Sequence, residues 1–166
     1  MNKPDSTVVA LDHESRLQED DHHSIRLWLR LLTCSNLIET RLRSRLREEF
    51  GITLPRFDFL AQLERVPDGL TMGELSQRMM VSGGNISGIA TQLESEGLID
   101  RSPVPGNRRT YCVRLTKRGR DQFSRMARLH EQWVIEMMGD LSVSEVDQMM
   151  HGLKKLKAGL ASREDS

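Results

Sequence analysis

Residues 101–120 concentrate positive charge. They carry seven basic side chains and no acidic one, although the whole chain of 166 residues has a formal net charge of zero. Such a local excess attracts phosphate groups. Proline, glycine and asparagine at residues 103–107 supply turn chemistry, and residues 110–115 alternate like a returning strand. The segment therefore predicts a basic β-hairpin directed at phosphates, the alternative being a solvated hairpin rich in arginine. Its basic residues are Arg101, Arg108, Arg109, Arg114, Lys117, Arg118 and Arg120.

Uncharged polar side chains precede the hairpin. Ile86, Ile89, Ala90 and Leu93 recur at helical spacing and should face a core. The opposite face, which has no charge before Glu94, offers hydrogen-bond donors and acceptors that suit base edges in a major groove. The residues predicted to contact a duplex are Ser82, Asn85, Ser87, Gly88, Thr91, Gln92, Arg108 and Arg109. We expect Asn85 to read sequence; the alternative is that it caps the helix after Ser82.

The elements that position these side chains form a helix-turn-helix. Thr71 and Glu74 have capping-box spacing, so a short helix should begin there. We expect its apolar face to contain Leu75, Met79 and Met80. A turn at residues 81–84, relaxed by two glycines, leads to the second helix, which ends at Gly97.

Long helices flank this unit. One is predicted at residues 25–50, Pro55 opens the next, and another runs from 116 to about 140. Ser142 and Glu145 form a second capping box, followed by apolar residues at near-heptad spacing. These are Val146, Met149, Met150, Leu153, Leu156 and Leu160. The terminal helices carry more apolar surface than a small domain can cover, which predicts a protein partner.

The order of these elements, with GLIDR before the hairpin and LTKRG after it, resembles the MarR family of bacterial transcriptional regulators over residues 25–161. In that family an Asp-x-Arg signature stands in the hairpin, where this chain has Asn107 and Arg109. The resemblance implies a mainly α fold with a small β-hairpin wing (α+β), a winged helix-turn-helix with N- and C-terminal dimerisation helices. It also implies a homodimer that binds a pseudo-palindromic operator in double-stranded DNA, acting as a repressor.

This resemblance suggests a division of the chain. The dimerisation region would comprise residues 25–50 and 116–162, and the winged helix-turn-helix region residues 51–115. Residues 1–24 hold six acidic side chains against two basic ones and lack periodicity, which predicts a disordered acidic arm.

Similar regulators commonly sense aromatic carboxylates or their CoA thioesters, which suggests a small-molecule effector. Aromatic and aliphatic walls and cationic partners for such a ligand could come from Arg26, Trp28, Arg30, Leu32, Arg56 and Phe57. The alternative is that these aromatics are core and these arginines are solvated.

Other classes of function have less support. Cys34 and Cys112 match no metal-binding spacing, and a thiol-based redox sensor acting through Cys34 is the alternative to a ligand sensor. The sequence has no motif for nucleophilic, metal-dependent or phosphate-loop catalysis, so we expect neither an enzyme nor a cofactor. It also lacks a signal peptide and a hydrophobic run of membrane length, which predicts a cytoplasmic protein.

Overall fold

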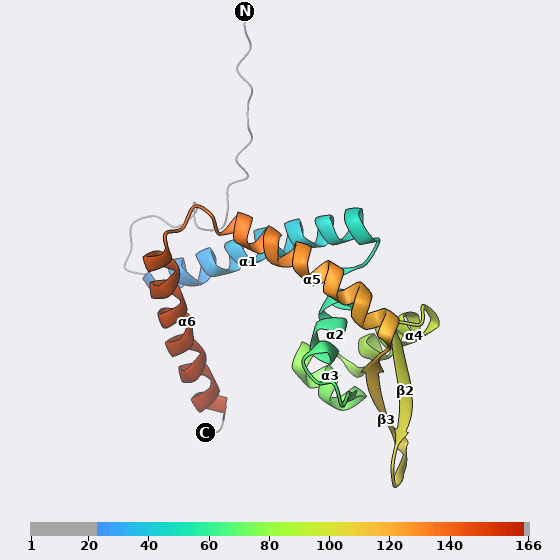
Figure 1. Cartoon of the computed structure of the whole chain (residues 1–166). Helices are drawn as coiled ribbons and strands as arrows, with labels where there is room; N and C mark the ends of the chain where they lie inside the picture. The colour runs from blue at the N-terminus through green and yellow to red at the C-terminus, as the bar shows by residue number, and fades with distance from the viewer. Residues whose placement is uncertain (1–22, 165–166) are drawn as a thin grey trace, which may run out of the picture. The chain divides into compact units, whose positions relative to one another are not determined.

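Six helices and three strands make up residues 23–164, the part of the chain that the computed structural model describes (Figure 1). The helices are α1 (His23–Phe50), α2 (Leu54–Glu64), α3 (Met72–Met79), α4 (Gly83–Ser95), α5 (Lys117–Met137) and α6 (Val143–Glu164). The strands are β1 (Leu70–Thr71), β2 (Ile99–Val104) and β3 (Asn107–Leu115). This mainly helical fold with a small antiparallel sheet confirms the predicted fold class. The chain divides into two compact units, with the boundary inside α5 after Arg120.

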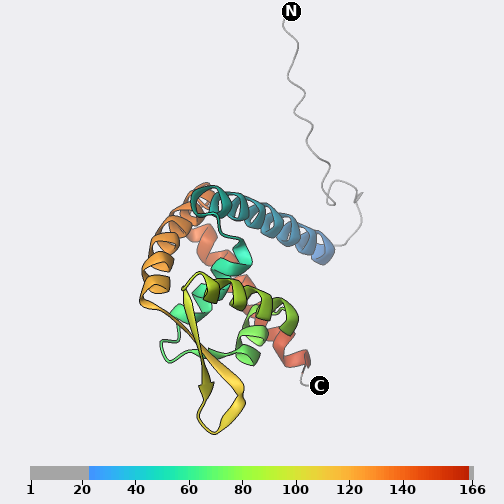
Figure 2. The same ribbon diagram turned by 90° about the vertical axis from the view of Figure 1, so that its right-hand side faces the viewer.

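Strand β3 is the centre of the sheet, with β1 on one side and β2 on the other, and both pairings are antiparallel. The β2–β3 hairpin, which we call the wing, extends beyond α2, α3 and α4 in both views (Figure 1, Figure 2). At its tip Gly106 has a φ of +80°, as the second central residue of a type II turn requires. The sequence does not predict β1, because two residues are too few to show alternation.

The core of the first unit lies where α2, α3 and α4 pack together and against the sheet. Leu46, Phe59 and Leu60 are completely buried, and so are Leu75, Ile86 and Leu93 on the inner faces of α3 and α4. Burial of such side chains stabilises a fold by about 1.5–3 kcal/mol each. The apolar spacing of α4 thus fixes which face of this helix remains outside.

Helix α3 begins with the predicted capping box. Thr71 Oγ1 accepts a 3.3 Å hydrogen bond from the Glu74 backbone N–H, and Glu74 Oε2 accepts a 2.7 Å bond from the Thr71 backbone N–H. The Thr71 backbone N–H and hydroxyl, which both donate to the Glu74 carboxylate, lower the pKa of that carboxyl below its usual range. The first turn of α3 is therefore stabilised by an ionised glutamate.

The turn between α3 and α4 differs from the prediction. Met80, expected on the apolar face of α3, is 93% exposed and is the C-cap residue, with a left-handed φ of 53°. Gly83 and Gly84 are not in the turn: they begin α4, and neither has a positive φ. The chain reverses earlier because the Val81 N–H bonds the Ser76 carbonyl at 3.2 Å, which ends α3 before the glycines.

Backbone contacts join the end of α4 to the start of α5. Gly97 has a φ of +69°, and the Leu98 N–H donates to the Leu93 carbonyl at 2.9 Å, which confirms the predicted glycine stop. Thr116 Oγ1 donates to the Gly97 carbonyl at 2.8 Å and accepts from the Gly119 N–H at 2.9 Å. A Cβ on Gly119 would lie 1.9 Å from the Leu98 carbonyl oxygen, so this position requires glycine. These contacts explain why the LTKRG segment has threonine at residue 116 and glycine at residue 119.

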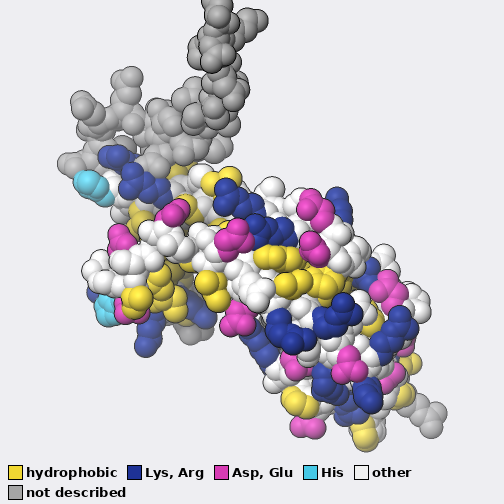
Figure 3. Space-filling model, turned by 45° about the horizontal axis from the view of Figure 1, so that its top comes forward, with side chains coloured by type: hydrophobic (Ala, Val, Ile, Leu, Met, Phe, Trp, Pro, Cys, Tyr) yellow, Lys and Arg dark blue, Asp and Glu magenta, His cyan; other side chains and the backbone are white. Residues whose placement is uncertain are grey.

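The outer helices retain large apolar side chains on their surface. On α1 these include Ile25, Leu27, Trp28 and Leu37. On α6 all six residues of the near-heptad stripe are exposed, and Ser142 and Glu145 form the predicted capping box. Yellow apolar side chains are open to solvent in the space-filling view (Figure 3).

Some predicted boundaries shift. Helix α1 begins at His23 rather than at residue 25, and α5 ends at Met137 rather than near residue 140. The predicted acidic arm lies outside the described residues, apart from residues 23 and 24, which belong to α1.

Candidate nucleic-acid interface

The outward face of α4 is exposed and carries the polar residues that the sequence places there. Its three hydroxyl groups donate to the backbone of their own helix. Ser87 Oγ donates to the Gly83 carbonyl at 3.0 Å, and Thr91 Oγ1 donates to the Ser87 carbonyl at 2.9 Å. Ser95 Oγ makes a similar 2.7 Å bond to the Gln92 carbonyl. With their protons engaged, these hydroxyls present mainly acceptor oxygens to a ligand.

The amide side chains of Asn85 and Gln92 are different. Both are exposed, and neither has a hydrogen-bond partner among the described residues. The helix begins after Ser82 without any side-chain capping bond, so the alternative role of Asn85 as a cap has no support. These two amides can pair bidentately with an adenine edge.

Two positions next to these amides on the exposed face of α4 carry no side chain. Gly84 and Gly88 lie on the exposed face, and a Cβ built on either meets no atom within 4 Å. Neither has a positive φ, so the fold itself does not require glycine at these positions. Their absence of side chains lets another molecule approach the backbone of α4 closely.

The wing carries less free positive charge than its sequence suggests. Arg114 Nε donates to the Asp68 carbonyl at 2.7 Å, and the Arg101 side chain bonds α4, so both side chains have protein partners. Arg109 is exposed near the tip, and its backbone N–H donates to Asn107 Oδ1 at 3.1 Å. Arg108 precedes it in β3.

Two arginines from other elements pair with the acidic residues near the end of α4. Arg101 Nε, from β2, lies 2.9 Å from Glu94 Oε2, and its NH2 group donates to Thr91 Oγ1 at 3.0 Å. Arg56, from α2, forms an ion pair with Glu96. Neither pairing could be predicted from the sequence, because each joins different elements that only packing brings together; residues 56 and 96 are 40 positions apart.

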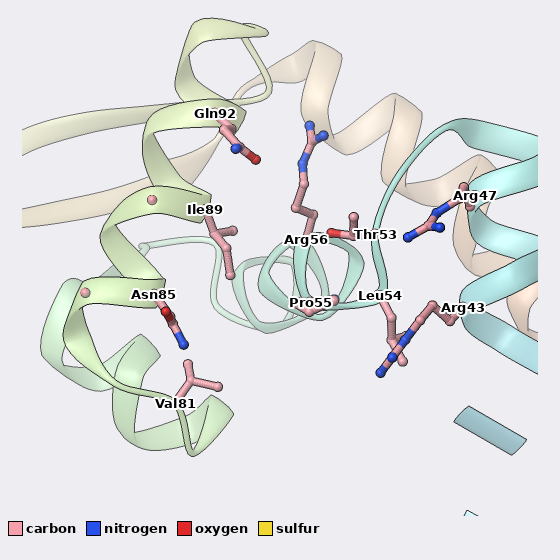
Figure 4. A pocket seen from close by; sticks show the side chains of 12 residues that line it. Arg43, Arg47, Thr53, Leu54, Pro55, Arg56, Val81, Asn85, Ile89 and Gln92 are labelled. Atoms are coloured by element: carbon pink, nitrogen blue, oxygen red, sulfur yellow. The ribbon is translucent and has the colours of Figure 1, made fainter. Parts of the chain in front are cut away.

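A cleft of about 590 Å³ lies between α4 on one side and the end of α1 and start of α2 on the other (Figure 4). Arg43, Arg47 and Arg56 line it, and two of these arginines form ion pairs with carboxylates outside the lining, Arg43 with Glu39 and Arg56 with Glu96. The remaining lining residues are Thr53, Leu54, Pro55, Val81, Gly84, Asn85, Gly88, Ile89 and Gln92. Ile89, predicted as core, is half-buried and lines this cleft instead. The cleft combines cations, amides and apolar surface, which suits an organic anion.

The predicted ligand-binding residues are not brought together. Of the six, only Arg56 lines the cleft. Phe57 is a core residue with 5% of its surface exposed, whereas Trp28 is 58% exposed on α1. Arg26 and Arg30 are exposed and Leu32 is half-buried on the same helix. The missed cations, Arg43 and Arg47, have the i, i+4 spacing of one helix face, a signal that the sequence does carry.

The cysteines and possible metal ligands of the described residues do not form a site. Cys34 is exposed on α1, and Cys112 is half-buried, with its Sγ 3.4 Å from the Asp68 carbonyl oxygen. Residues 23–164 contain no group of histidine, cysteine and acidic side chains that could hold a metal ion. No helix in this range has the length and apolar character needed to cross a membrane.

Comparison with known proteins agrees with this geometry. Residues 50–110 match the profile of the MarR family. The transcriptional activatory protein BadR of Rhodopseudomonas palustris is 29% identical over 84% of this chain and 81% of its own length. An uncharacterised HTH-type transcriptional regulator of Bacillus cereus is 30% identical over 76% of this chain and 83% of its own length.

A solved structure gives the same fold. The MarR-family regulator Sco3205 of Streptomyces coelicolor, crystallised in complex with DNA, superposes with a TM-score of 0.75 and 21% identity. The superposition covers 87% of this chain and 91% of Sco3205. With the profile match and the Bacillus cereus relative, it leads to one conclusion: the chain belongs to the MarR family of winged helix-turn-helix transcriptional regulators.

Proposed function

We propose that this protein is a homodimer that binds a pseudo-palindromic operator in double-stranded DNA, with α4 in the major groove. The exposed Asn85 and Gln92 amides, which have no partner among the described residues, carry this proposal. They suit base edges, and Ser82, Ser87, Gly88 and Thr91 belong to the same surface. Arg108 and Arg109 would hold the flanking phosphates. The DNA in the Sco3205 crystal supports this role for the shared fold.

The exposed stripe on α6 supports the homodimer. Val146, Met149 and Leu153 are three of its large apolar side chains, and a contiguous apolar surface of this kind marks an interaction site. We assign residues 25–50 and 116–162 to dimerisation and 51–115 to DNA binding. Two-fold symmetry would present two α4 helices to two half-sites, hence the pseudo-palindrome.

Selection from a random duplex library tests this function. The purified protein should enrich an inverted repeat whose half-sites lie about one helical turn apart, or a multiple of it. Fluorescence anisotropy should then give tighter binding to the selected duplex than to a shuffled duplex of the same composition. Failure to enrich any sequence, with equal affinity for both duplexes, would contradict it.

The effect on transcription can take either sign. A repressor is the leading proposal, since an operator that overlaps a promoter excludes polymerase. An activator is the second candidate, because BadR is an activatory protein. A reporter gene behind a promoter containing the selected duplex separates the two: expression should fall when the regulator is present if it represses, and rise if it activates.

We further propose an aromatic acid or its CoA thioester as effector. The cleft supports this proposal, since Arg47 can bind a carboxylate together with Arg43 and Arg56, which also pair with Glu39 and Glu96, while Leu54 and Ile89 contact a ring. An acid that prefers the DNA-free state must weaken DNA binding by linkage. Because the cleft contains the Asn85 and Gln92 side chains, its occupant and a DNA base would compete for them.

Matched compounds test the effector. Benzoate should raise the melting temperature and release DNA, whereas benzamide, which has the ring without the charge, should do neither. Arg43→Ala combined with Arg47→Ala should abolish the response. If no aromatic acid acts but peroxide abolishes binding, and Cys34→Ser prevents that loss, the redox alternative replaces the ligand proposal; the exposure of Cys34 is what supports it.

A further inference from the structure

The Arg101 side chain is largely buried against α4 and does not project from the wing. Arg101 belongs to β2, where its Cα pairs with that of Val113, and its side chain is only 21% exposed. The guanidinium contacts α4 at two points: its NH2 group donates a hydrogen bond to Thr91, and its Nε forms an ion pair with Glu94 that lacks hydrogen-bond geometry. A side chain bound in this way cannot extend toward a phosphate without breaking both contacts.

Glu94 explains why α4 needs such a partner. Its side chain is 44% exposed, and it stands one turn after Thr91 on the flank of α4 that faces the wing. An ionised carboxylate beside a DNA backbone repels it, and like charges across an interface reduce affinity strongly. The neighbouring guanidinium cancels this charge between α4 and the wing.

Thr91 keeps the guanidinium in place. Its Oγ1 accepts the 3.0 Å bond from Arg101 and donates the 2.9 Å bond to the Ser87 carbonyl. The hydroxyl is thus tied to the helix backbone, and Arg101 is tied to the hydroxyl. These two hydrogen bonds hold the guanidinium beside Glu94.

We propose that Arg101 is a positioning residue that neutralises Glu94 between α4 and the wing, the two elements proposed to bind DNA, and that it does not itself contact phosphate. The proposal rests on the DNA-binding function proposed above. It assigns different roles to two arginines of the same wing: Arg109 attracts the phosphate backbone, whereas Arg101 removes an internal repulsion.

Charge rescue separates these roles. Arg101→Ala should weaken binding to the selected duplex by roughly tenfold, because Glu94 is then uncompensated. Adding Glu94→Gln to Arg101→Ala should restore affinity to within about twofold of the unmodified protein and leave the dependence on salt unchanged. Arg109→Ala is the matched control, since adding Glu94→Gln should leave its lowered salt slope unchanged. Melting temperatures of all variants should accompany the binding curves.

The single variant Glu94→Gln removes the carboxylate and leaves the Arg101 guanidinium without its ionic partner. It should raise DNA affinity severalfold, because one uncompensated positive charge then lies between the two elements that bind DNA. Two results would overturn the inference: unchanged or lower affinity in Glu94→Gln, which would mean that DNA does not sense this carboxylate, or a double variant that stays weak with a salt slope lower by about 0.9, as loss of one phosphate contact requires. If instead the unmodified protein binds no duplex, the proposed function itself fails.

Discussion

Asn107 holds the backbone of Arg109 rather than its side chain: Asn107 Oδ1 accepts the Arg109 backbone N–H at 3.1 Å. The asparagine shapes the tip of the wing, and among the described residues the Arg109 guanidinium has no ion-pair partner. The two residues of the family signature therefore have separable roles in this chain.

Arg109→Ala should weaken binding to selected and random duplexes alike, because a phosphate contact carries no sequence information. The salt slope should fall by about one unit, with the melting temperature unchanged. Asn107→Ala should instead lower the free energy of unfolding by about 0.5–1.5 kcal/mol. Binding and melting curves on the two variants check this; a large loss of stability in Arg109→Ala would contradict it.

Gly88→Ala should stabilise the protein and impair its function. A Cβ at Gly88 meets no atom within 4 Å, and alanine in a helix is favoured over glycine by about 0.5–1 kcal/mol. The same methyl group would separate α4 from the groove and cost about 1–3 kcal/mol of binding free energy. Gly73→Ala, also in open space but on α3, is the control for stability alone. Unchanged DNA affinity in Gly88→Ala would show that the backbone does not approach DNA there.

The Thr71–Glu74 capping box should make stability depend on pH. Because hydrogen bonds from Thr71 lower the pKa of Glu74 in the folded state, this group stabilises the fold above the ordinary glutamate pKa of about 4.3. Its contribution is lost as pH falls through the lower pKa of the folded state. Urea unfolding should find Glu74→Gln less stable than the unmodified protein at neutral pH, and the two should converge in acid. Thr71→Ala should cost about 1 kcal/mol at neutral pH.

Substitutions on α6 should dissociate the dimer. Leu153→Glu places a charge in the exposed apolar stripe and should give a monomer in light scattering after gel filtration, as should ending the chain before Ser142. Lys155→Glu, on the opposite face of α6, should leave the dimer intact. A soluble dimer of unchanged stability after truncation would contradict the assignment of α6 to dimerisation.

Local devices were predictable from sequence because both partners lie within a few residues of each other. The capping boxes at Thr71 and Ser142 and the glycine stop at Gly97 are all present. The spacing of Ile86, Ala90 and Leu93 also identified the buried face of α4. The outward face, with Asn85 and Gln92, then followed by elimination.

Features that depend on packing could not be predicted in this way. The pairing of Arg101 with Glu94 requires β2 to lie against α4, and the pairing of Arg56 with Glu96 requires α2 to lie near the C-terminal end of α4. The burial of Phe57, expected in the wall of a ligand site, could not be predicted either, because periodicity identifies an apolar residue but does not distinguish a core residue from a pocket residue. Met80 was misplaced because a left-handed non-glycine residue has no sequence signal.

Sequence reading by Asn85 is the central claim, and Asn85→Ala tests it most directly. The side chain has no hydrogen-bond partner among the described residues, so its removal should leave the melting temperature unchanged. Anisotropy titrations should show a loss of about 1–3 kcal/mol on the selected duplex, little loss on a shuffled duplex, and the same salt slope on both. Gln132→Ala, an exposed amide on α5, should change none of these quantities. Equal weakening of Asn85→Ala on both duplexes, or a lower melting temperature with specificity intact, would contradict the claim.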